Sequence, residues 1–294
     1  MAELSGKTIL ITGGSRGIGQ AIGLRCASAG ANIVIVAKED LSQHSGASIY
    51  SVADQMIEAG GQALVIDCDV RDEAAIQAAV GKAVSEFGLI NVLINNVSAF
   101  CFTDTMNTTP DNLDLLFSVN ARATFLMTKA CIPSLRKSYN PHVINISPPL
   151  DMNPKWFANH LAFSLSKYGM SLCTLGMAAE FKEAGIAVNS LWPLTTIATT
   201  TIQDHFVPQV FAGSRWPSIM ADAAYELMQR SAEDCTGNFF IDETLLREVG
   251  VTNFSHYAVD PGVPLMQDLF IPDKYLEENR KGTPLVKNMF MQHK

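Results

Sequence analysis

A phenylalanine and a lysine one helical turn apart lie in the segment of this sequence that most suggests chemistry, HLAFSLSKYGM (His160–Met170). Phe163 precedes Lys167 by four residues, so in a helix their side chains share one face. His160, three residues before Phe163, is expected on nearly the same face, whereas Tyr168 lies about 140° round the helix. Lys167 can carry a charge or a proton, but the phenyl ring of Phe163 has no proton to give.

A glycine-rich loop near the N-terminus predicts a phosphate-binding site. The segment TGGSRGIG follows an apolar run and opens a helical one. Glycines at such a place allow a tight turn and let the backbone approach a pyrophosphate, which then lies at the helix N-terminus. The pattern is specific because it falls between the first strand and the first helix. We therefore expect a dinucleotide cofactor held by Thr12, Gly13, Ser15, Arg16, Gly17, Ile18 and Gly19.

The end of the second apolar run bears on the choice between NADP and NAD. In NAD-binding chains an acidic residue at this place binds the ribose 2′-hydroxyl. This chain has VAKED, with Ala37 at that place and Lys38 after it, and Arg16 can reach the same corner. These two cations favour the 2′-phosphate of NADP over NAD. Glu39 and Asp40 weaken the inference, and a solvated surface lysine is the alternative role for Lys38.

Alternating apolar and helical segments predict the elements that position these residues. Continuous apolar strands separated by helices indicate a parallel sheet covered on both faces. The sequence therefore predicts an α/β fold, a Rossmann-type doubly wound parallel sheet of about seven strands with helices on both faces. The expected strands are 7–12, 32–37, 63–70, 90–96, 142–147, 186–192 and 238–242, and the expected helices include 17–30, 72–88, 110–137 and 158–183.

Composition argues against several kinds of partner. The chain has 294 residues, 48% of them hydrophobic, and a net charge of -8. The acidic balance argues against nucleic acid, the six cysteines lack metal-ligand spacing, and no apolar stretch reaches the roughly 18 residues of a membrane span. We expect residues 1–294 to form one domain, with 243–294 as a C-terminal extension packed on it. A cytoplasmic location is favoured, and import into a peroxisome or mitochondrion is left open.

These motifs resemble those of the short-chain dehydrogenase/reductase family. TGGSRGIG matches the family's TGxxxGxG loop, and further matches follow in order between about residues 5 and 242. The segments CDV, NNVS, SVNAR and SLWPL carry them. The resemblance places Asn120 and Lys167 at the family's catalytic asparagine and lysine. The further cofactor contacts that it implies are Asp69, Val70, Asn95, Asn96, Lys167 and Pro193.

The same resemblance makes Phe163 the main departure from the family. The family moves a hydride between a nicotinamide and a carbinol or carbonyl carbon, with a tyrosine phenol as acid or base and a serine on the substrate oxygen. Phe163 occupies the tyrosine position, and Pro148 occupies the serine position, which leaves Ser147 as the nearest hydroxyl. An acid–base group typically contributes 10²–10⁴-fold, so we expect low or no activity. Either a natural replacement or an introduced exchange would produce this pattern.

Other residues around this face each have alternative roles. Tyr168 is expected to face the core or a neighbouring subunit rather than to replace the missing phenol. His160 is a candidate proton donor, although a capping role at the helix start is favoured. Trp156 and Phe157 form either an apolar wall of the substrate pocket, together with His160, or ordinary loop packing.

Several stretches resemble one group within the family, the hydroxysteroid dehydrogenase-like protein 2 group. They include ACIPSLRKS, NISPPLDMNPKWF, TGNFFIDE and YAVDPGVPL. The group commonly carries a sterol-carrier domain, which these 294 residues do not include. Family resemblance also implies a homodimer or homotetramer formed through helices 110–137 and 158–183.

Two functions follow as alternatives. The first is an NADP-dependent oxidoreductase that acts on an apolar alcohol or carbonyl and is crippled by Phe163. The second is an NADP-binding pseudoenzyme with a sensor or scaffold role. An intact cofactor site fits both, so the behaviour of a Phe163→Tyr variant distinguishes them.

Overall fold

A parallel sheet lies at the centre of the computed structural model, which describes residues 3–38, 48–279 and 285–286. Seven strands follow the order β3-β2-β1-β4-β5-β6-β7, and every neighbouring pair is parallel. The predicted α/β fold is confirmed. The strands are β1 Thr8–Thr12, β2 Asn32–Ala37, β3 Gln62–Asp67, β4 Val92–Asn95, β5 His142–Ile146, β6 Ala187–Trp192 and β7 Phe239–Ile241.

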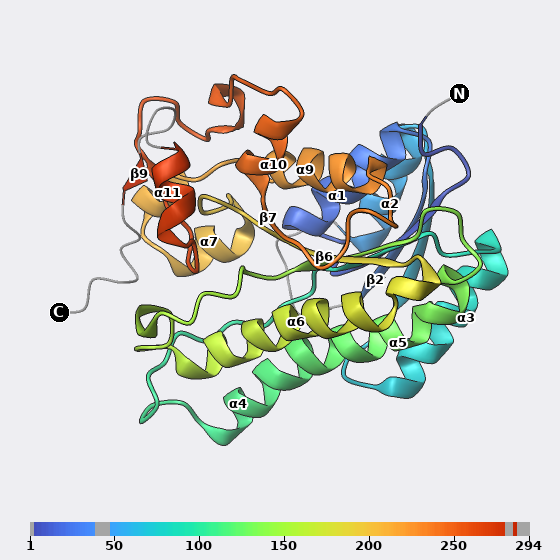
Figure 1. Cartoon of the computed structure of the whole chain (residues 1–294), viewed down its shortest axis with the longest axis horizontal. Helices are drawn as coiled ribbons and strands as arrows, with labels where there is room; N and C mark the ends of the chain where they lie inside the picture. The colour runs from blue at the N-terminus through green and yellow to red at the C-terminus, as the bar shows by residue number, and fades with distance from the viewer. Residues whose placement is uncertain (1–2, 39–47, 280–284, 287–294) are drawn as a thin grey trace.

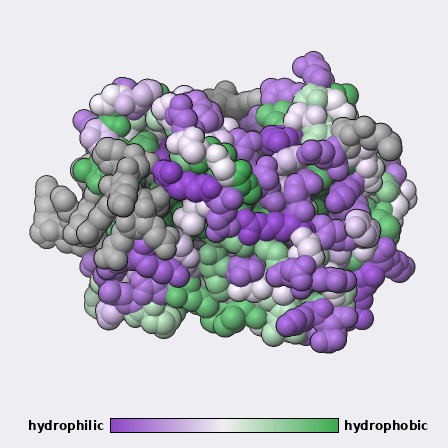
Figure 2. Space-filling model, turned by 45° about the horizontal axis from the view of Figure 1, so that its top comes forward, coloured by the Kyte–Doolittle hydropathy of each residue, from purple (hydrophilic) through white to green (hydrophobic). Residues whose placement is uncertain are grey.

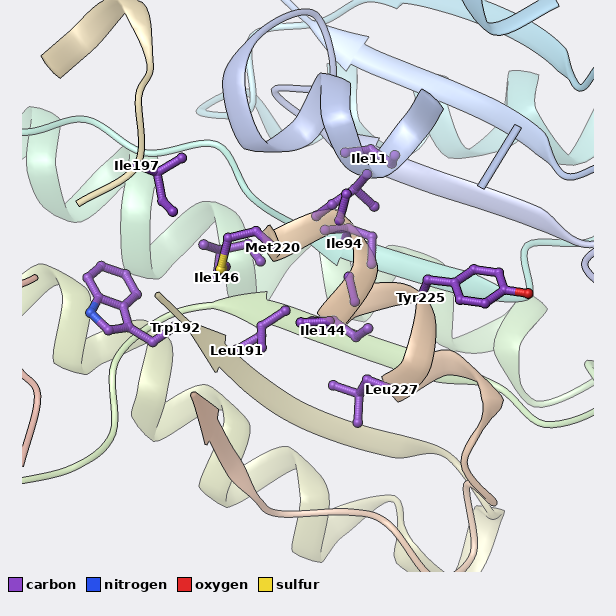
Figure 3. Packing of buried hydrophobic residues seen from close by; sticks show 14 of the residues in the cluster. Ile11, Ile94, Ile144, Ile146, Leu191, Trp192, Ile197, Met220, Tyr225 and Leu227 are labelled. Carbon is purple, nitrogen blue, oxygen red and sulfur yellow. The ribbon is translucent and has the colours of Figure 1, made fainter. Parts of the chain in front are cut away.

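The sheet is buried because helices cover both of its faces. Helices α1 (Gly17–Ser28), α2 (Ile49–Glu58), α9 (Ser218–Gln229) and α10 (Asp242–Glu248) cover one face, and α3 (Glu73–Phe87), α5 (Ala123–Leu135) and α6 (Leu161–Glu180) cover the other (Figure 1). Figure 3 shows Ile11, Ile94 and Ile144 of adjacent strands beside Met220, Tyr225 and Leu227 of α9. Strands enclosed in this way read as continuous apolar runs, which is why they could be located from the sequence.

Strand β3 ends earlier than predicted. It stops at Asp67 instead of continuing to residue 70. Asp69 accepts hydrogen bonds from the backbone N–H of Arg71, at 3.0 Å, and from its guanidinium. This local turn takes the chain out of the sheet before α3 begins.

The predicted helix 110–137 consists of three segments. Helix α4 (Pro110–Leu116) begins at Thr109, whose hydroxyl accepts from the backbone N–H of Asn112 at 3.2 Å. A π-helical segment, η1 (Phe117–Arg122), then joins α4 to α5. Such wide turns are frequent at functional sites, and this one carries Asn120.

The part of the chain after β7 returns to the carboxyl-terminal edge of the sheet. The backbone N–H of Asp268 donates to the carbonyl of Leu194, at 3.0 Å, and the Trp192 indole donates to the carbonyl of Leu269, at 2.8 Å. Because β6 ends at Trp192, these bonds fix the returning segment beside the ends of the strands. The remaining elements are η2 Pro154–Trp156, η3 Lys182–Ala184, α7 Thr200–His205, α8 Pro208–Ala212, η4 Ser255–Tyr257, β8 Leu265–Met266, α11 Asp273–Asn279 and β9 Leu285–Val286.

Candidate active site

The glycine loop lies at the switch point of the sheet, where β1 neighbours both β2 and β4. Gly13 and Gly17 adopt φ angles of +67° and +57°, which favour glycine. At Gly19 a Cβ atom would lie 2.4 Å from the carbonyl oxygen of Gly13. The loop therefore requires these glycines, and it opens into the crevice where doubly wound folds bind ligands.

Two polar side chains hold the loop in place. Asn96 donates from Nδ2 to the carbonyl oxygens of Thr12 and Gly13, both at 3.0 Å. The hydroxyl of Thr12 accepts from the backbone N–H groups of Asn96, at 3.0 Å, and Val97, at 3.2 Å. The Asn95 side chain instead points away from the crevice and donates to buried acceptors behind β4, Thr128 and Asn145.

A cavity of about 260 Å³ lies on one side of this crevice. Predicted cofactor residues Lys38, Asp69 and Val70 line it, together with Ala37 and Val97. Glu39 and Asp40, which the sequence set against Lys38, fall outside the described residues.

Arg71 lines the same cavity and was not predicted from the sequence. Asp69 accepts from its guanidinium Nε at 2.9 Å and from Lys38 Nζ at 3.3 Å. The hydrogen bond from Arg71 holds the pKa of the Asp69 carboxyl well below its usual range. The position of Arg71 directly after the CDV motif is the signal that would have found it.

A second cavity, of about 220 Å³, lies on the other side of the crevice. The predicted residues Ile18, Asn96, Phe163, Lys167 and Pro193 line it. Phe163 and Lys167 therefore share one face of α6 and one cavity, as their four-residue spacing predicts. Most of the remaining wall is apolar, with Phe100, Phe102, Ile146, Trp192, Ile197, Phe206 and Leu269.

Lys167 is nearly inaccessible, with 2% of its surface exposed. Its Nζ donates to the carbonyl of Ile146 at 2.8 Å and lies 5.0 Å from the centre of the Trp192 ring. Burial lowers the pKa of Lys167 to about 7, and the charge of Asp268, another residue of this cavity, acts in the opposite direction. This lysine can change protonation state near neutral pH.

Asn120 holds the segment after β4 against α6. Its Oδ1 accepts from the backbone N–H of Ala99 at 2.8 Å. Its Nδ2 donates to the Ala99 carbonyl and to the Ser166 hydroxyl, both at 2.9 Å. The side chain is fully buried, so its geometry is that of a positioning residue, and a part in a proton relay stays a prediction.

The structure does not bring Ser147 to the cavity, contrary to the expectation that its hydroxyl replaces the family serine. Its side chain is fully buried, and its hydroxyl is hydrogen-bonded to that of Ser190 at 2.8 Å. Successive side chains of an extended chain point to opposite faces. Because Ile146 faces the cavity, Ser147 faces the core behind it.

The predicted substrate wall is also absent from the described lining of the cavity, which includes none of Trp156, Phe157 and His160. Trp156 is buried, and its Nε1 donates to Asp151 Oδ2 at 2.7 Å. Phe157 packs against Tyr168, with ring centroids 4.9 Å apart. Of the alternatives for these two residues, the structure supports loop packing.

His160 and Tyr168 are both buried, His160 against Phe163 and Tyr168 against Phe157 and Phe270. His160 precedes the first residue of α6, makes no side-chain cap hydrogen bond, and is instead bonded through Nδ1 to Ser164 Oγ at 2.9 Å. The Tyr168 hydroxyl donates to the carbonyl of Asp151 at 2.6 Å, so it faces the core as expected. Burial raises the pKa of Tyr168 to about 12.

Two aromatic residues from distant segments pack against Phe163, and one of them, Phe102, lines the cavity. Phe102 lies 4.9 Å from the Phe163 ring in an edge-to-face arrangement, and Phe270 of the C-terminal extension stacks on it at 6.1 Å. The run AFCF directly after the NNVS motif was the available signal for Phe102. Within the described residues no group of three His, Cys, Asp or Glu side chains could hold a metal ion, and no helix is long and apolar enough to cross a membrane.

Comparison with known proteins agrees with this geometry. Residues 7–207 match the family model described as short chain dehydrogenase. The chain is 49% identical over 277 residues to hydroxysteroid dehydrogenase-like protein 2 of Homo sapiens, and 48% identical over 288 residues to that of Rattus norvegicus. These matches cover 94% and 96% of this chain but only 65% and 54% of the relatives, so the chain spans roughly half to two thirds of their length.

Solved structures give the same result. A short chain dehydrogenase of Mycobacterium thermoresistibile is 42% identical, with a TM-score of 0.86 over 92% of this chain and 96% of that one. A metagenomic short-chain oxidoreductase in complex with NADP is 26% identical, with a TM-score of 0.67 over 81% of this chain and 97% of the other. The glycine loop, the switch-point crevice and these relatives show together that the chain belongs to the short-chain dehydrogenase family.

Proposed function

We propose that this chain is an NADP-dependent oxidoreductase that acts on an apolar alcohol or carbonyl compound and whose turnover is limited by Phe163. The observation that carries the proposal is the arrangement of one crevice. A glycine loop opens between a cavity bordered by Lys38 and Arg71 and an apolar cavity that contains Phe163 and Lys167. Val97 lines the first cavity and the adjacent Asn96 lines the second, so the two cavities are neighbours.

This arrangement fits a dinucleotide. The first cavity would take the adenosine half, the N-terminus of α1 the pyrophosphate, and the second cavity the nicotinamide half. When bound, the cofactor supplies the hydride. Lys167 holds the nicotinamide ribose in this proposal, and the aromatic wall excludes water from the reacting atoms.

Two cations support NADP as the cofactor. Lys38 and Arg71 border the first cavity, and both contact Asp69. Asp67, Asp69 and Asp72 act on Cys68 of the same cavity, so the support comes from the two cations as donors to a 2′-phosphate and not from the net charge of the corner. The structural relative in complex with NADP is consistent with this choice.

Replacing Arg71 by alanine should weaken NADPH binding about tenfold and NADH binding much less, because only NADPH carries the 2′-phosphate. Fluorescence titration of both nucleotides measures the ratio. Lys129→Ala is the matched control, since Lys129 forms another exposed ion pair, with Glu73 at 3.2 Å. NADH binding more tightly than NADPH to the unchanged protein would refute the assignment.

The wall of the second cavity supports an apolar substrate. Phe100, Phe102 and Phe206 come from two different loops and line it together with Ile197. The polar groups are few, and a ligand would be selected mainly by its apolar surface. The substrate proposed is therefore an apolar ketone, aldehyde or secondary alcohol.

A pseudoenzyme is the second candidate, and the packing of Phe163 favours it. The ring is 6% exposed and lies among Phe102, His160 and Phe270, an environment that suits an apolar side chain. In this alternative the chain binds NADP as a sensor or scaffold. Stoichiometric NADPH binding with no turnover, both in this chain and in Phe163→Tyr, would support it.

We also propose that two copies associate through α4, η1, α5 and α6. These segments carry large apolar side chains that are 39–57% exposed, and Figure 2 shows apolar surface along the lower side of the molecule. They are Leu113, Leu115, Phe117, Phe125, Leu165, Leu172 and Leu175. An apolar patch of this kind marks an interaction surface.

The double exchange Phe125→Glu and Leu172→Glu should therefore convert a dimer or tetramer into a monomer, because it places charges in a desolvated contact. Light scattering measures the mass. Val249→Glu, at a 47% exposed residue after α10, is the control that should leave the mass unchanged. A monomeric mass for the unchanged protein would contradict the proposal.

A further inference from the structure

An acidic residue from the C-terminal extension lies in the same cavity as Phe163 and Lys167. Asp268 lines that cavity beside Trp192 and Leu269. The residue is partly exposed, whereas both of its chain neighbours are buried. Among the described residues that line this cavity, Asp268 and Lys167 are the two whose side chains titrate.

The backbone fixes the place of this carboxyl group. The N–H of Asp268 donates to the carbonyl of Leu194 at 3.0 Å. Its Oδ1 accepts from the N–H of Leu269 at 2.6 Å, which leaves Oδ2 for another partner. On the far side, Phe270 stacks on Phe163 with an angle of 29° between the rings. The extension therefore brings Asp268 to the cavity that Phe163 lines and Phe270 to the Phe163 ring.

Two charged groups act on Asp268. Lys167 of α6 favours its ionised form, and Asp242, at the start of α10, disfavours it. The side chain keeps part of its surface exposed, but protein atoms enclose the carboxyl group, and this desolvation is the largest effect. It outweighs the hydrogen bond from Leu269, which acts in the opposite direction, and raises the pKa of Asp268 to about 7. A carboxyl group whose pKa is raised toward neutral pH is suited to act as a general acid or base.

We propose that Asp268 is a catalytic residue that exchanges the proton with the substrate oxygen in place of the absent phenol. The inference rests on the proposed function. During reduction the carbonyl carbon receives a hydride and the C=O π electron pair moves to the oxygen. The O–H bond of Asp268 breaks, an O–H bond forms on the substrate, and Asp268 is left as a carboxylate that regains its proton from solvent. Oxidation of the alcohol follows the reverse path.

A double-mutant cycle tests this assignment. The four proteins are the unchanged chain, Asp268→Asn, Phe163→Tyr and the double variant, assayed for reduction of acetophenone, cyclohexanone and 2-decanone with NADPH. Asparagine keeps an oxygen for the Leu269 N–H but gives up no proton. We expect Asp268→Asn to lower kcat/KM at least 100-fold when residue 163 is Phe, and less than about fivefold when it is Tyr.

The pH profile gives a second readout. Reduction requires the protonated acid, so kcat/KM of the unchanged chain should fall as the pH rises through about 7, and oxidation should rise. In Asp268→Asn this change of kcat/KM near pH 7 should be absent. Asp273→Asn is the control, because Asp273 lies on the same extension but is exposed and paired with Lys155 at 2.9 Å.

Infrared difference spectroscopy observes the group without turnover. The C=O band of a protonated carboxyl should titrate near pH 7, shift when a ketone binds to the NADPH complex, and be absent in Asp268→Asn. The inference is overturned if kcat/KM of Asp268→Asn equals that of the unchanged chain, or if the exchange lowers kcat/KM equally with Phe and with Tyr at residue 163. It is also overturned if only proteins with Phe163→Tyr turn over. If the proteins with Phe and with Tyr at residue 163 both fail to turn over, the proposed function fails. The infrared shift then decides by itself whether Asp268 contacts the substrate.

Discussion

Replacing Phe163 by tyrosine should raise kcat for reduction of an apolar ketone with NADPH by about 10²–10⁴-fold. The phenol would supply a proton donor one helical turn before Lys167, in the cavity that both residues line. A lysine charge at that spacing lowers the pKa of a phenol toward the working range. The reference for this gain is kcat of the unchanged chain, in which Asp268 is the proposed proton donor.

The surroundings of residue 163 should accept the added hydroxyl. The ring borders the cavity, so the new oxygen extends toward space that the substrate oxygen would share. Stopped-flow absorbance of NADPH measures the rate, and Phe163→Leu is the matched control that lacks a proton and should show no gain. An unchanged kcat, with NADPH bound equally to both forms, would contradict the account and favour the pseudoenzyme.

Replacing Lys167 by methionine should remove activity and at the same time stabilise the fold below neutral pH. Activity is lost because the lysine holds the nicotinamide ribose in the proposed function. Stability increases because the lysine is buried, with a pKa lowered from 10.5 to about 7. Methionine fills a similar volume, carries no charge, and leaves the Ile146 carbonyl without its lysine partner.

The pH dependence of that stability follows from proton binding. Between pH 7 and 10.5 the unfolded state holds a proton on Lys167 that the folded state has lost, so stability rises with pH across this window. Below pH 7 the folded chain carries the full penalty of a buried charge. We expect Lys167→Met to gain roughly 1–3 kcal/mol at pH 6 and little at pH 10.

Urea unfolding at the two pH values measures this difference. Lys129→Met, at an exposed lysine, is the control and should show no such pH-dependent gain. If Lys167→Met were less stable than the unchanged chain at pH 6, the conclusion that the buried charge of Lys167 destabilises the fold for the sake of function would be wrong.

Local pattern was sufficient to predict the sheet and the glycine loop. Most strand residues are apolar, although β5 carries Asn145 and β6 carries Asn189 and Ser190. Each glycine that the loop requires is visible in TGGSRGIG. The shared face of Phe163 and Lys167 followed from spacing alone. These features depend on neighbours within one or two turns of the chain.

Features that depend on the tertiary fold could not be predicted in the same way. Asp268 and Phe270 lie about a hundred residues after Phe163, and only the path of the extension brings them to it. Because Ile146 faces the cavity, the next side chain, Ser147, points into the core and contacts Ser190. Trp156 is buried and bonded to Asp151, so it does not line the cavity. The π-helical turn at Asn120 breaks a helix that periodicity describes as continuous.

Deuterium transfer tests the central claim, that this crevice performs hydride chemistry limited by residue 163, most directly. NADPH that carries deuterium at both positions of nicotinamide C4 is incubated with acetophenone and the Phe163→Tyr protein, and the alcohol is analysed by mass spectrometry and NMR. We expect one deuterium on the carbinol carbon, in a single enantiomer. Saturating NADPH binding with no labelled alcohol would contradict it.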